Sequence, residues 1–374
     1  MNIALVRGDF AAPAELPNFF PLAQKHDVTL FTGLKPVWNL GNTKDIQVQK
    51  LISPVDFNFG HINRYTMAIL NRVFTDAHVL FGLEEKLKGF DVAHCAETYY
   101  SYTQQCITAK QKGYVETVVC TVWENTAFNN EGITGRKEFK KRAFENVDKF
   151  LAVTKRAREV LIEEGCGAEK IEVLMPGVNL QLFKREKIQK FGGLQKNGKI
   201  KLLFSGRLIK EKGILEILTM FAKLQLALPQ SELIIAGEGE LRPEIEEQIS
   251  SLKLSNVLLL GKVSYFDMPK IYSLCDLLLH FPVGSFTWKE QYGMALIEAM
   301  ACGLPVVGLD SGSVSEVVGG GGVVVEKEDY FSQLNMVVVD KKKISQLSRK
   351  AEEYAKKNYD ALKYAERLEE IYQL

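Results

Sequence analysis

The sequence has no C-x-x-C pair, and its six cysteines are irregularly spaced over 374 residues. In a chain of this length, such spacing predicts reduced, mostly buried thiols in a cytosolic setting. A zinc site built from His94 and Cys95 is disfavoured, because adjacent residues rarely serve together as metal ligands.

The sequence also lacks a long apolar run and a strong net charge. No window of about 18 residues is both apolar and uncharged, so we expect no transmembrane helix. The first residues do not resemble a signal peptide, because Arg7 and Asp9 end a short apolar run. The formal net charge of +1 argues against a protein that coats nucleic acid. We therefore expect a cytoplasmic protein without a nucleic-acid partner.

The second half of the chain alternates between short apolar runs and helical periodicity. Strands are expected near 199–205, 231–237, 256–261, 276–281 and 304–309, and helices near 213–229, 240–254, 266–275 and 293–303. Continuous apolar strands suit a parallel sheet that helices cover on both faces. The alternation predicts a doubly wound α/β domain.

The first half follows the same pattern less regularly, which suggests a second α/β domain and a cleft between the two. Strands are expected at 1–7, 27–32, 90–94, 116–122, 148–153 and 170–174, and helices near 63–88, 98–112, 136–147 and 154–165. The seam is expected in the polar segment 181–199, and the tail 347–374 is expected to be helical throughout.

Ligands of such folds bind at the carboxyl ends of the strands, where the segment "FSGRLIKEKG" (204–213) is expected. Gly206 allows a close backbone approach, and Arg207 and Lys212 add two positive charges beside a helix start. This favours a diphosphate, although a solvated turn with two surface cations explains the same residues.

A second candidate is "WKEQYGMALIEAMACGLPVVGLDSG" (288–312), where a helix is expected to start at Gly293. The amides of Gly293, Met294 and Ala295 would face outward and favour an anion. Glu290 and Glu298 flank them, and eight helical residues span roughly 12 Å, comparable with a diphosphate and its sugars. The alternative is a helix-start glutamate plus a surface glutamate.

Three further segments are less specific. The Gly-x-Gly of 234–240 suits close ligand approach or a simple turn, and the glycines of 308–325 suggest a flexible loop near the cleft or a plain turn. The basic segment 135–159 suggests contact with anionic lipid or a phosphorylated acceptor, or else a solvated helix face.

Taken in order, these segments resemble the retaining glycosyltransferases of family 4, also called group 1 glycosyltransferases, which have the GT-B fold. The signature match is "EQYGMALIEAMACGLPVV" (290–307), and "GRLIKEKG" (206–213) is similar to the segment that binds the donor diphosphate. Similar stretches occur at 173–183 and 261–279. The resemblance is strong over about 145–325 and weaker over 1–144.

The resemblance implies two Rossmann-like domains facing each other across a cleft. The acceptor-side domain would span 1–182, with a C-terminal helix at about 358–374 returning to it. The domain that binds the nucleotide sugar would span 183–357.

The resemblance also implies roles for individual residues. Glu290 would hold hydroxyls of the transferred sugar, Glu298 would hold the ribose, and Arg207 and Lys212 would neutralise the leaving diphosphate. The remaining donor contacts would come from Gly206, Gly237, Lys262, Val263, Gly293, Met294 and Ala295. No metal or cofactor would be required besides the nucleoside-diphosphate sugar.

The acceptor side departs from the family pattern. Trp123 and Glu124 stand after the expected strand where many members carry a histidine, and only Gly8 remains of a glycine pair after the first strand. A nucleophile on this side would have to be Glu97, Glu124 or a neighbour.

We expect a retaining hexosyltransferase that uses a nucleoside-diphosphate sugar and a glycosyl acceptor. The sequence does not identify the nucleotide, the sugar, the acceptor or the linkage. It also leaves open the oligomeric state and whether the protein contacts a membrane peripherally. The alternatives are an epimerase or phosphorylase with the same fold, or a binding protein without turnover.

Overall fold

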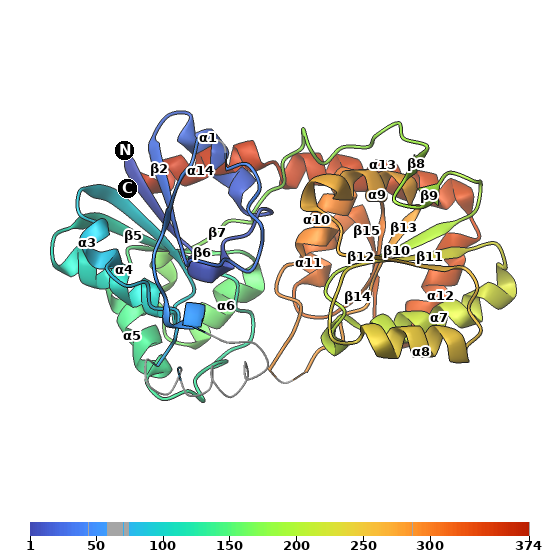
Figure 1. Cartoon of the computed structure of the whole chain (residues 1–374), viewed down its shortest axis with the longest axis horizontal. Coiled ribbons are helices and arrows are strands. Elements are labelled where there is room, and N and C mark those ends of the chain that lie inside the picture. The colour runs from blue at the N-terminus through green and yellow to red at the C-terminus, as the bar shows by residue number, and fades with distance from the viewer. Residues whose placement is uncertain (44, 58–69, 71–74, 286, 374) are drawn as a thin grey trace. The chain divides into compact units, whose positions relative to one another are not determined.

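The computed structural model describes residues 1–43, 45–57, 70, 75–285 and 287–373. The chain divides into two compact units (Figure 1). Unit 1 comprises Met1–Gly177 and Ala361–Leu374, and unit 2 comprises Val178–Asp360. The first boundary lies a few residues before 182, the position expected from the sequence.

Unit 1 contains a parallel sheet with the strand order β3-β2-β1-β4-β5-β6-β7. The strands are β1 (Asn2–Val6), β2 (Asp27–Thr32), β3 (Gln47–Lys50), β4 (Phe90–Ala96), β5 (Val115–Val122), β6 (Lys149–Ala152) and β7 (Ile171–Val173). The strand order reverses between β1 and β4, which pair from Ile3 with Val92 to Leu5 with His94. Loops that follow these two strands leave in opposite directions, which opens a binding position.

Strand β3 is absent from the sequence expectation, because the sequence QVQK carries little hydrophobic signal. All four of its residues are exposed, as suits a short strand at the edge of a sheet. Of the helix expected near 63–88, residues 63–69 and 71–74 lie outside the described residues. The expectation is wrong for 75–82, which are not helical, and the short helix α3 spans Leu83–Lys86. The other α-helices described in unit 1 are α1 (Phe20–Ala23), α4 (Ser101–Gln111), α5 (Arg136–Asn146), α6 (Lys155–Glu163) and α14 (Ala361–Tyr372).

Unit 2 contains a parallel sheet with the strand order β12-β11-β10-β13-β14-β15. The strands are β10 (Lys201–Ser205), β11 (Glu232–Ala236), β12 (Val257–Gly261), β13 (Leu277–His280), β14 (Val306–Leu309) and β15 (Gly322–Val325). The order reverses between β10 and β13, so this unit also has a switch point. A small antiparallel pair, β8 (Lys190–Phe191) and β9 (Leu194–Gln195), lies within the expected seam.

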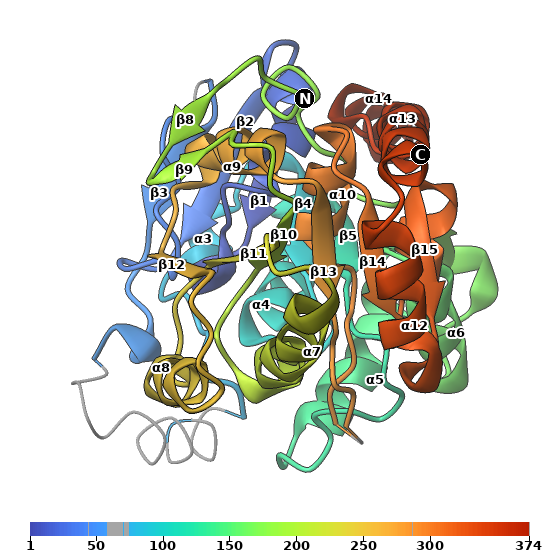
Figure 2. The same cartoon turned by 90° about the vertical axis from the view of Figure 1, so that its right-hand side faces the viewer.

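Helices cover both faces of this sheet (Figure 2). One face carries α7 (Ile214–Ala227), α8 (Arg242–Ser251) and α12 (Lys327–Val338), whose apolar residues share a core with the strands. The other face carries α9 (Met268–Leu274), α10 (Met294–Ala301) and α13 (Lys341–Asn358). Burial on both faces explains why these strands are continuous apolar runs rather than alternating ones.

The expectation of a flexible loop at 308–325 is wrong. This segment contains the end of β14, the short helix α11 (Val314–Val318) and the strand β15. The glycines serve close packing, because a Cβ at Gly322 would lie 2.5 Å from the carbonyl oxygen of Val306. The sequence pattern does not reveal a strand that begins within a run of glycines.

The tail is not one continuous helix, as was expected, because α13 ends at Asn358 and α14 begins at Ala361. Tyr359 lies at the break, where its carbonyl oxygen accepts a hydrogen bond from the amide of Val178 at 2.8 Å. Its hydroxyl donates to the carbonyl of Val317 at 2.6 Å. These buried contacts fix the residue at which the chain leaves unit 2.

Helix α14 packs into a core of unit 1. Leu368 and Ile371 are buried in one cluster with Ile3 and Leu5 of β1. The hydroxyl of Tyr372 lies 2.5 Å from Nδ1 of His94, and both side chains are buried. The last turn of the chain is therefore bonded to a central strand of the first sheet.

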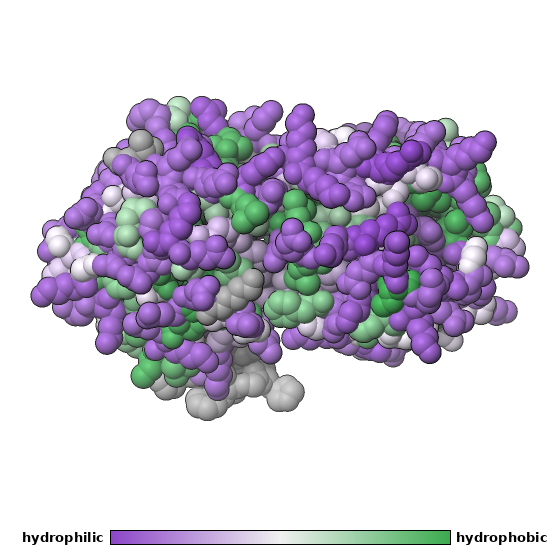
Figure 3. Space-filling model, turned by 90° about the horizontal axis from the view of Figure 1, so that it is seen from above, coloured by the Kyte–Doolittle hydropathy of each residue, from purple (hydrophilic) through white to green (hydrophobic). Residues whose placement is uncertain are grey.

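Hydrophobic residues are scattered among hydrophilic ones on the surface seen in Figure 3. Of the helices in the described part of the chain, none has the length and apolar character needed to cross a membrane.

We predict that Leu368→Ala lowers the free energy of unfolding by about 2–5 kcal/mol, because it leaves a cavity in the core of unit 1. Leu362→Ala on the same helix is the matched control, since Leu362 is 57% exposed and its loss should cost less than about 0.5 kcal/mol. Urea unfolding of both variants measures the difference. Equal effects would show that α14 contributes no specific packing.

Candidate active site

The switch point of unit 2 brings together two loops with charged side chains. The loop after β10 contains Arg207 and ends in a short 3-10 helix that includes Lys212. The segment after β13 contains Glu290 and leads into α10. His280 is the last residue of β13 and faces the same place.

Glu290 lies between two nitrogen groups. Lys212 Nζ donates a hydrogen bond of 2.5 Å to Oε2 of Glu290. Nε2 of His280 lies 3.1 Å from the same oxygen. The Lys212 ammonium also lies 5.2 Å from the centre of the Trp288 ring, within the range of a cation–π contact. The lysine is thereby held between an anion and an aromatic face.

Glu290 stays ionised although it is only 5% exposed. Burial by itself raises the pKa of its carboxyl group. The His280 ring and the Lys212 ammonium outweigh this effect and lower the pKa to about 2. The site therefore presents a fixed negative charge beside a fixed positive one at neutral pH.

Two glycines shape this site. Gly213 has φ +66°, and a Cβ there would lie 1.9 Å from the carbonyl oxygen of Phe281. Glycine is thus required for the loop of Lys212 to approach the end of β13. Gly293 has φ +80° and precedes the first turn of α10. No side-chain hydrogen bond caps this helix start, so the first amides of α10, at Met294 and Ala295, are not satisfied by a capping side chain.

Glu298 lies one turn further along α10 in a different environment. It is 6% exposed and accepts a hydrogen bond of 2.9 Å from the Tyr272 hydroxyl of α9. Burial raises its pKa to about 7, and the tyrosine only partly opposes this rise. No cation is among the causes of the shift, in contrast to Glu290.

The remaining donor candidates follow the strand ends of the same sheet edge. Arg207 is exposed just after Gly206. Gly237 follows β11, and a Cβ there would lie 1.8 Å from the carbonyl oxygen of Gly206. Lys262 and Val263 follow the edge strand β12, the lysine exposed and the valine half-buried. All the candidates that the sequence assigned to the donor therefore lie on unit 2.

Unit 1 has its own polar groups at the β1–β4 switch point. Gly8 has φ +52° and lies against the ring of Tyr102. The next residue, Asp9, is 7% exposed, and neither carboxylate oxygen has a hydrogen-bond partner within the described residues. A Cβ at Gly33 would lie 1.9 Å from Asp9 Oδ1, so this glycine makes room for the aspartate. Burial raises the pKa of Asp9 to about 6.

Glu97 follows β4 and has φ +60°, a backbone conformation that non-glycine residues rarely adopt. Its Oε1 accepts a hydrogen bond of 2.8 Å from the amide of Trp123. Its Oε2 is buried and has no hydrogen-bond partner in the described part of the chain. Burial and the neighbouring Glu124 raise the pKa of Glu97 to about 8.

Glu124 has no such open position. Its Oε1 accepts from the amides of Asn125 and Thr126, and its Oε2 accepts from the side-chain amides of Asn129 and Asn130. These contacts satisfy the carboxylate within its own loop. Of the two glutamates proposed from the sequence, Glu97 is therefore the one with an oxygen available to a ligand.

Two residues of these sites were missed by the sequence reasoning. His280 is the last residue of an apolar strand, and nothing in its local pattern distinguishes it from a buried structural histidine. Asp9 follows directly after the first strand and Gly8, so its position at a carboxyl end was a usable signal.

The GT-B glycosyltransferases have two doubly wound units in one chain. This chain has that architecture, with a lysine–glutamate pair at the switch point of unit 2. Residues 185–372 match the model of the family described as glycosyl transferases group 1, and the chain belongs to this family.

Known relatives match part of this chain. An uncharacterized glycosyltransferase of Methanocaldococcus jannaschii is 26% identical over 246 residues, which cover 65% of this chain and 63% of the relative. The N-acetyl-alpha-D-glucosaminyl L-malate synthase of Bacillus anthracis is 30% identical over 139 residues, 36% of this chain and 34% of that enzyme. The matched parts thus span less than two thirds of these relatives.

Solved structures show the same fold over nearly the whole length. HepE of Anabaena, crystallised with UDP, has a TM-score of 0.76 at 18% identity and covers 99% of both chains. Sucrose-phosphate synthase of Thermosynechococcus elongatus has a TM-score of 0.74 at 15% identity and covers 100% of this chain and 98% of that enzyme.

We predict that the Glu290 pair stabilises the fold in a pH-dependent manner. Because the folded-state pKa of about 2 lies below the ordinary 4.5, the contribution is complete above pH 4.5 and is lost as the pH falls toward 2. At about 1.4 kcal/mol per pKa unit, it is on the order of 3 kcal/mol. Urea unfolding should show the difference between wild type and Glu290→Gln shrinking as the pH is lowered.

Glu298→Gln should show the opposite trend, since the folded-state pKa of Glu298 is raised to about 7. Wild type should lose stability relative to this variant as the pH rises from 4.5 through 7. Glu244→Gln, a change at an exposed residue of α8, serves as the control with no pH-dependent difference. If the stability difference from wild type depended on pH in the same way for Glu290→Gln and Glu244→Gln, the lowered pKa of Glu290 would be contradicted.

Proposed function

We propose that this chain transfers a hexose from a nucleoside-diphosphate sugar to an acceptor, with retention of the anomeric configuration. The observation that carries the proposal is the Lys212–Glu290–His280 cluster at the switch point of unit 2, directly before the start of α10. Such a place suits a ligand that combines a diphosphate with a polyhydroxylated ring.

The leaving diphosphate would bind to Lys212, Arg207 and the amides that begin α10. The lysine ammonium has three donors, so it can keep its bond to Glu290 and still contact a phosphate oxygen. Fixed positive charge next to the departing oxygen stabilises the anion that develops in the transition state. Side chains and backbone supply this neutralisation in our proposal, without a metal ion.

The two glutamates would hold the two sugars of the donor. Ionised Glu290 accepts hydrogen bonds from hydroxyls of the transferred hexose, and its charge favours the cationic character that the ring acquires. Glu298, with its pKa near 7 and its bond to Tyr272, would accept from the ribose hydroxyls. Gly206, Gly237 and the backbone at Lys262 and Val263 would lie along the base and ribose.

We propose UDP as the nucleotide. The support is that HepE, which shares the fold at low identity, has been crystallised with UDP and with UDP-glucose.

On the acceptor side, we propose that Glu97 receives the proton of the attacking hydroxyl. Its buried Oε2 needs a hydrogen-bond donor, and a carboxyl with a pKa near 8 is a stronger base than an exposed one. Asp9, at the other strand of the same switch point, would orient the acceptor through hydroxyl contacts. Retention itself rests on the family resemblance, and either attack on the same face or a covalent intermediate would give it.

The donor assignment predicts that Glu290→Gln lowers turnover at saturating UDP-sugar by more than ten-fold, while UDP affinity changes little. The amide keeps the shape but loses charge-assisted bonds to the sugar, each worth roughly 1.5–3 kcal/mol. Arg207→Ala and Lys212→Ala should each cost on the order of 10²–10³ in rate. Assays with labelled UDP-glucose, UDP-galactose and UDP-N-acetylglucosamine measure both quantities.

Glu244→Gln, a change at the exposed glutamate on α8, is the matched control and should behave as wild type. If Glu290→Gln left turnover unchanged, Glu290 would not contact the transferred sugar. If UDP affinity fell as much as turnover, Glu290 would contact the nucleotide instead. Isomerisation of the donor without an acceptor would contradict transfer as the reaction, and a product of inverted configuration by NMR would contradict retention.

For the acceptor side, we predict that Glu97→Gln lowers the transfer rate by about 10²–10⁴-fold and leaves UDP affinity unchanged. Because the base form appears as the pH rises, wild-type transfer should increase up to about pH 8 and then level off. The variant should lack this rise. Glu116→Gln, at an exposed position of β5, is the control. Transfer is measured to the acceptor that a screen of simple glycosides identifies, and an unaltered pH profile in Glu97→Gln would refute the role.

A further inference from the structure

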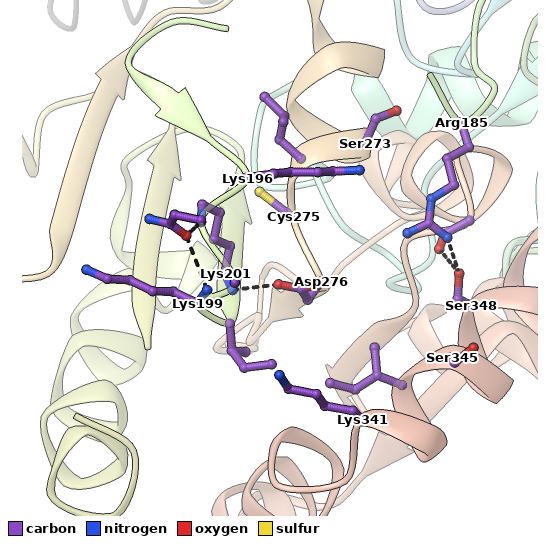
Figure 4. A pocket seen from close by; sticks show the side chains of 16 residues that line it. Arg185, Lys196, Lys199, Lys201, Ser273, Cys275, Asp276, Lys341, Ser345 and Ser348 are labelled. Carbon is purple, nitrogen blue, oxygen red and sulfur yellow. Dashed lines mark hydrogen bonds between the residues drawn. The ribbon is translucent and has the colours of Figure 1, made fainter. Parts of the chain in front are cut away.

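Unit 2 has a cavity of about 380 Å³ at the amino ends of its strands (Figure 4). Lys201 and Asp276 line it where β10 and β13 begin, and Gly303 lines it just before β14. The first turns of α13 close another side. The volume falls in the range of pockets that enclose small organic ligands.

Five basic side chains and one acidic side chain line this cavity. The basic residues are Arg185, Lys196, Lys199, Lys201 and Lys341, and the acidic one is Asp276. Figure 4 shows Arg185, Lys196 and Lys341 around the hollow, each from a different segment of the chain. All three side chains are exposed, and an anion placed between them would be attracted by each of the three charges.

Two of the five cations already have partners. Lys199 and Lys201 lie 3.0 and 3.2 Å from carboxylate oxygens of Glu232. Arg185, Lys196 and Lys341 form no ion pair with any residue in the described ranges, and Asp276 is the single carboxylate left among them. Glu232 carries one negative charge against two lysines, so the five cations together with Asp276 and Glu232 leave three units of positive charge in excess. This favours a multiply charged anion such as a phosphate monoester dianion.

The hydrogen-bonding groups match this charge. Nη1 of Arg185 donates to Ser348 Oγ at 2.9 Å, so its remaining guanidinium N–H groups are oriented beside the cavity. Ser345, on the same helix as Ser348, adds a hydroxyl to the lining. Burial raises the pKa of Asp276, whereas the bond from the Lys201 amide and the charges of Lys201, Arg185 and Lys196 lower it. These cations therefore act on one common region.

This cavity is separate from the donor site. Arg207, Lys212 and Glu290 follow the carboxyl ends of β10 and β13, whereas Lys201 and Asp276 stand at their amino ends. The five residues of β10 span roughly 15 Å, at about 3.3 Å per residue. A single diphosphate cannot occupy both places.

We propose that this cavity is a second anion site, which binds a small molecule carrying a phosphate monoester. Arg185 and Lys341 hold the phosphate from two sides, with Lys196 as the third charge. The rest of the cavity accommodates the organic part of the ester, because the volume exceeds that of phosphate alone.

Titration calorimetry with glycerol 3-phosphate tests the proposal, with excess UDP present to fill the donor site. Wild type should bind one equivalent, with a dissociation constant on the order of 1 mM or tighter. Arg185→Ala combined with Lys341→Ala should weaken this binding at least ten-fold. Arg349→Ala combined with Lys350→Ala removes the same charge from exposed positions of α13 that do not line the cavity, and should bind as wild type.

A parallel arm uses vesicles of phosphatidylcholine with one fifth phosphatidic acid, which carry the same glycerol phosphate on a lipid. Binding to the vesicles alone, lost in the Arg185 and Lys341 double variant, assigns the phosphate to a lipid headgroup; binding of the free ester assigns a soluble ligand. Equal binding by both double variants, or binding of neither probe, overturns the proposal. Because the comparison is between two variants, it remains decisive even if UDP does not bind.

Discussion

The pairing of the first and fourth strands in each sheet determines where this chain can carry chemistry. β10 pairs with β13 over only two residue pairs, Leu202 with Leu277 and Leu203 with Leu278. Beyond these pairs the backbones separate, and the following loops turn to opposite faces of the sheet. Lys212 and Glu290 reach each other from those two loops, although they are far apart in sequence. The same arrangement in unit 1 places Asp9 and Glu97 after β1 and β4.

The environment of each buried carboxylate then decides its charge. Glu290 is buried beside two nitrogen groups, and its pKa falls to about 2. Glu298, eight positions later, is buried beside a hydroxyl, and its pKa rises to about 7. Glu97 is buried beside another carboxylate, and its pKa rises to about 8. Three glutamates with the same intrinsic chemistry thereby offer a permanent anion, a group near its midpoint and a mostly protonated acid at neutral pH.

Local sequence patterns predicted most of the fold, and they failed where the determining contacts are distant. Apolar runs located every described strand of the large sheet of unit 2 except β15, which begins within glycines, and every described strand of unit 1 except the polar edge strand β3. The short pair β8 and β9 in unit 2 was also missed. The break at Tyr359 was missed, because it depends on a hydrogen bond from Val178. No spacing rule within one segment could locate that contact.

The candidate site was likewise predicted where local sequence patterns determine it and missed where distant contacts do. The motif around Gly293 identified Glu290 and Glu298, and the separate segment 204–213 identified Lys212; the family resemblance then assigned all three to one donor site. The proximity of His280 to Glu290 was not visible, because it depends on where β13 ends relative to the loop. Nor could the sequence separate Glu97 from Glu124, since the difference lies in the amide donors that satisfy the second carboxylate.

The return of α14 to the first sheet has a consequence for the order in which the protein can be completed during synthesis. Unit 1 leaves the ribosome first, yet the cluster around Ile3 and Leu5 lacks Leu368 and Ile371 until translation has passed through all of unit 2. Until then His94 also lacks the hydroxyl of Tyr372 beside it. The domain that begins the chain is therefore the last to acquire its full core, and a nascent chain exposes that apolar surface for the time needed to make the other domain.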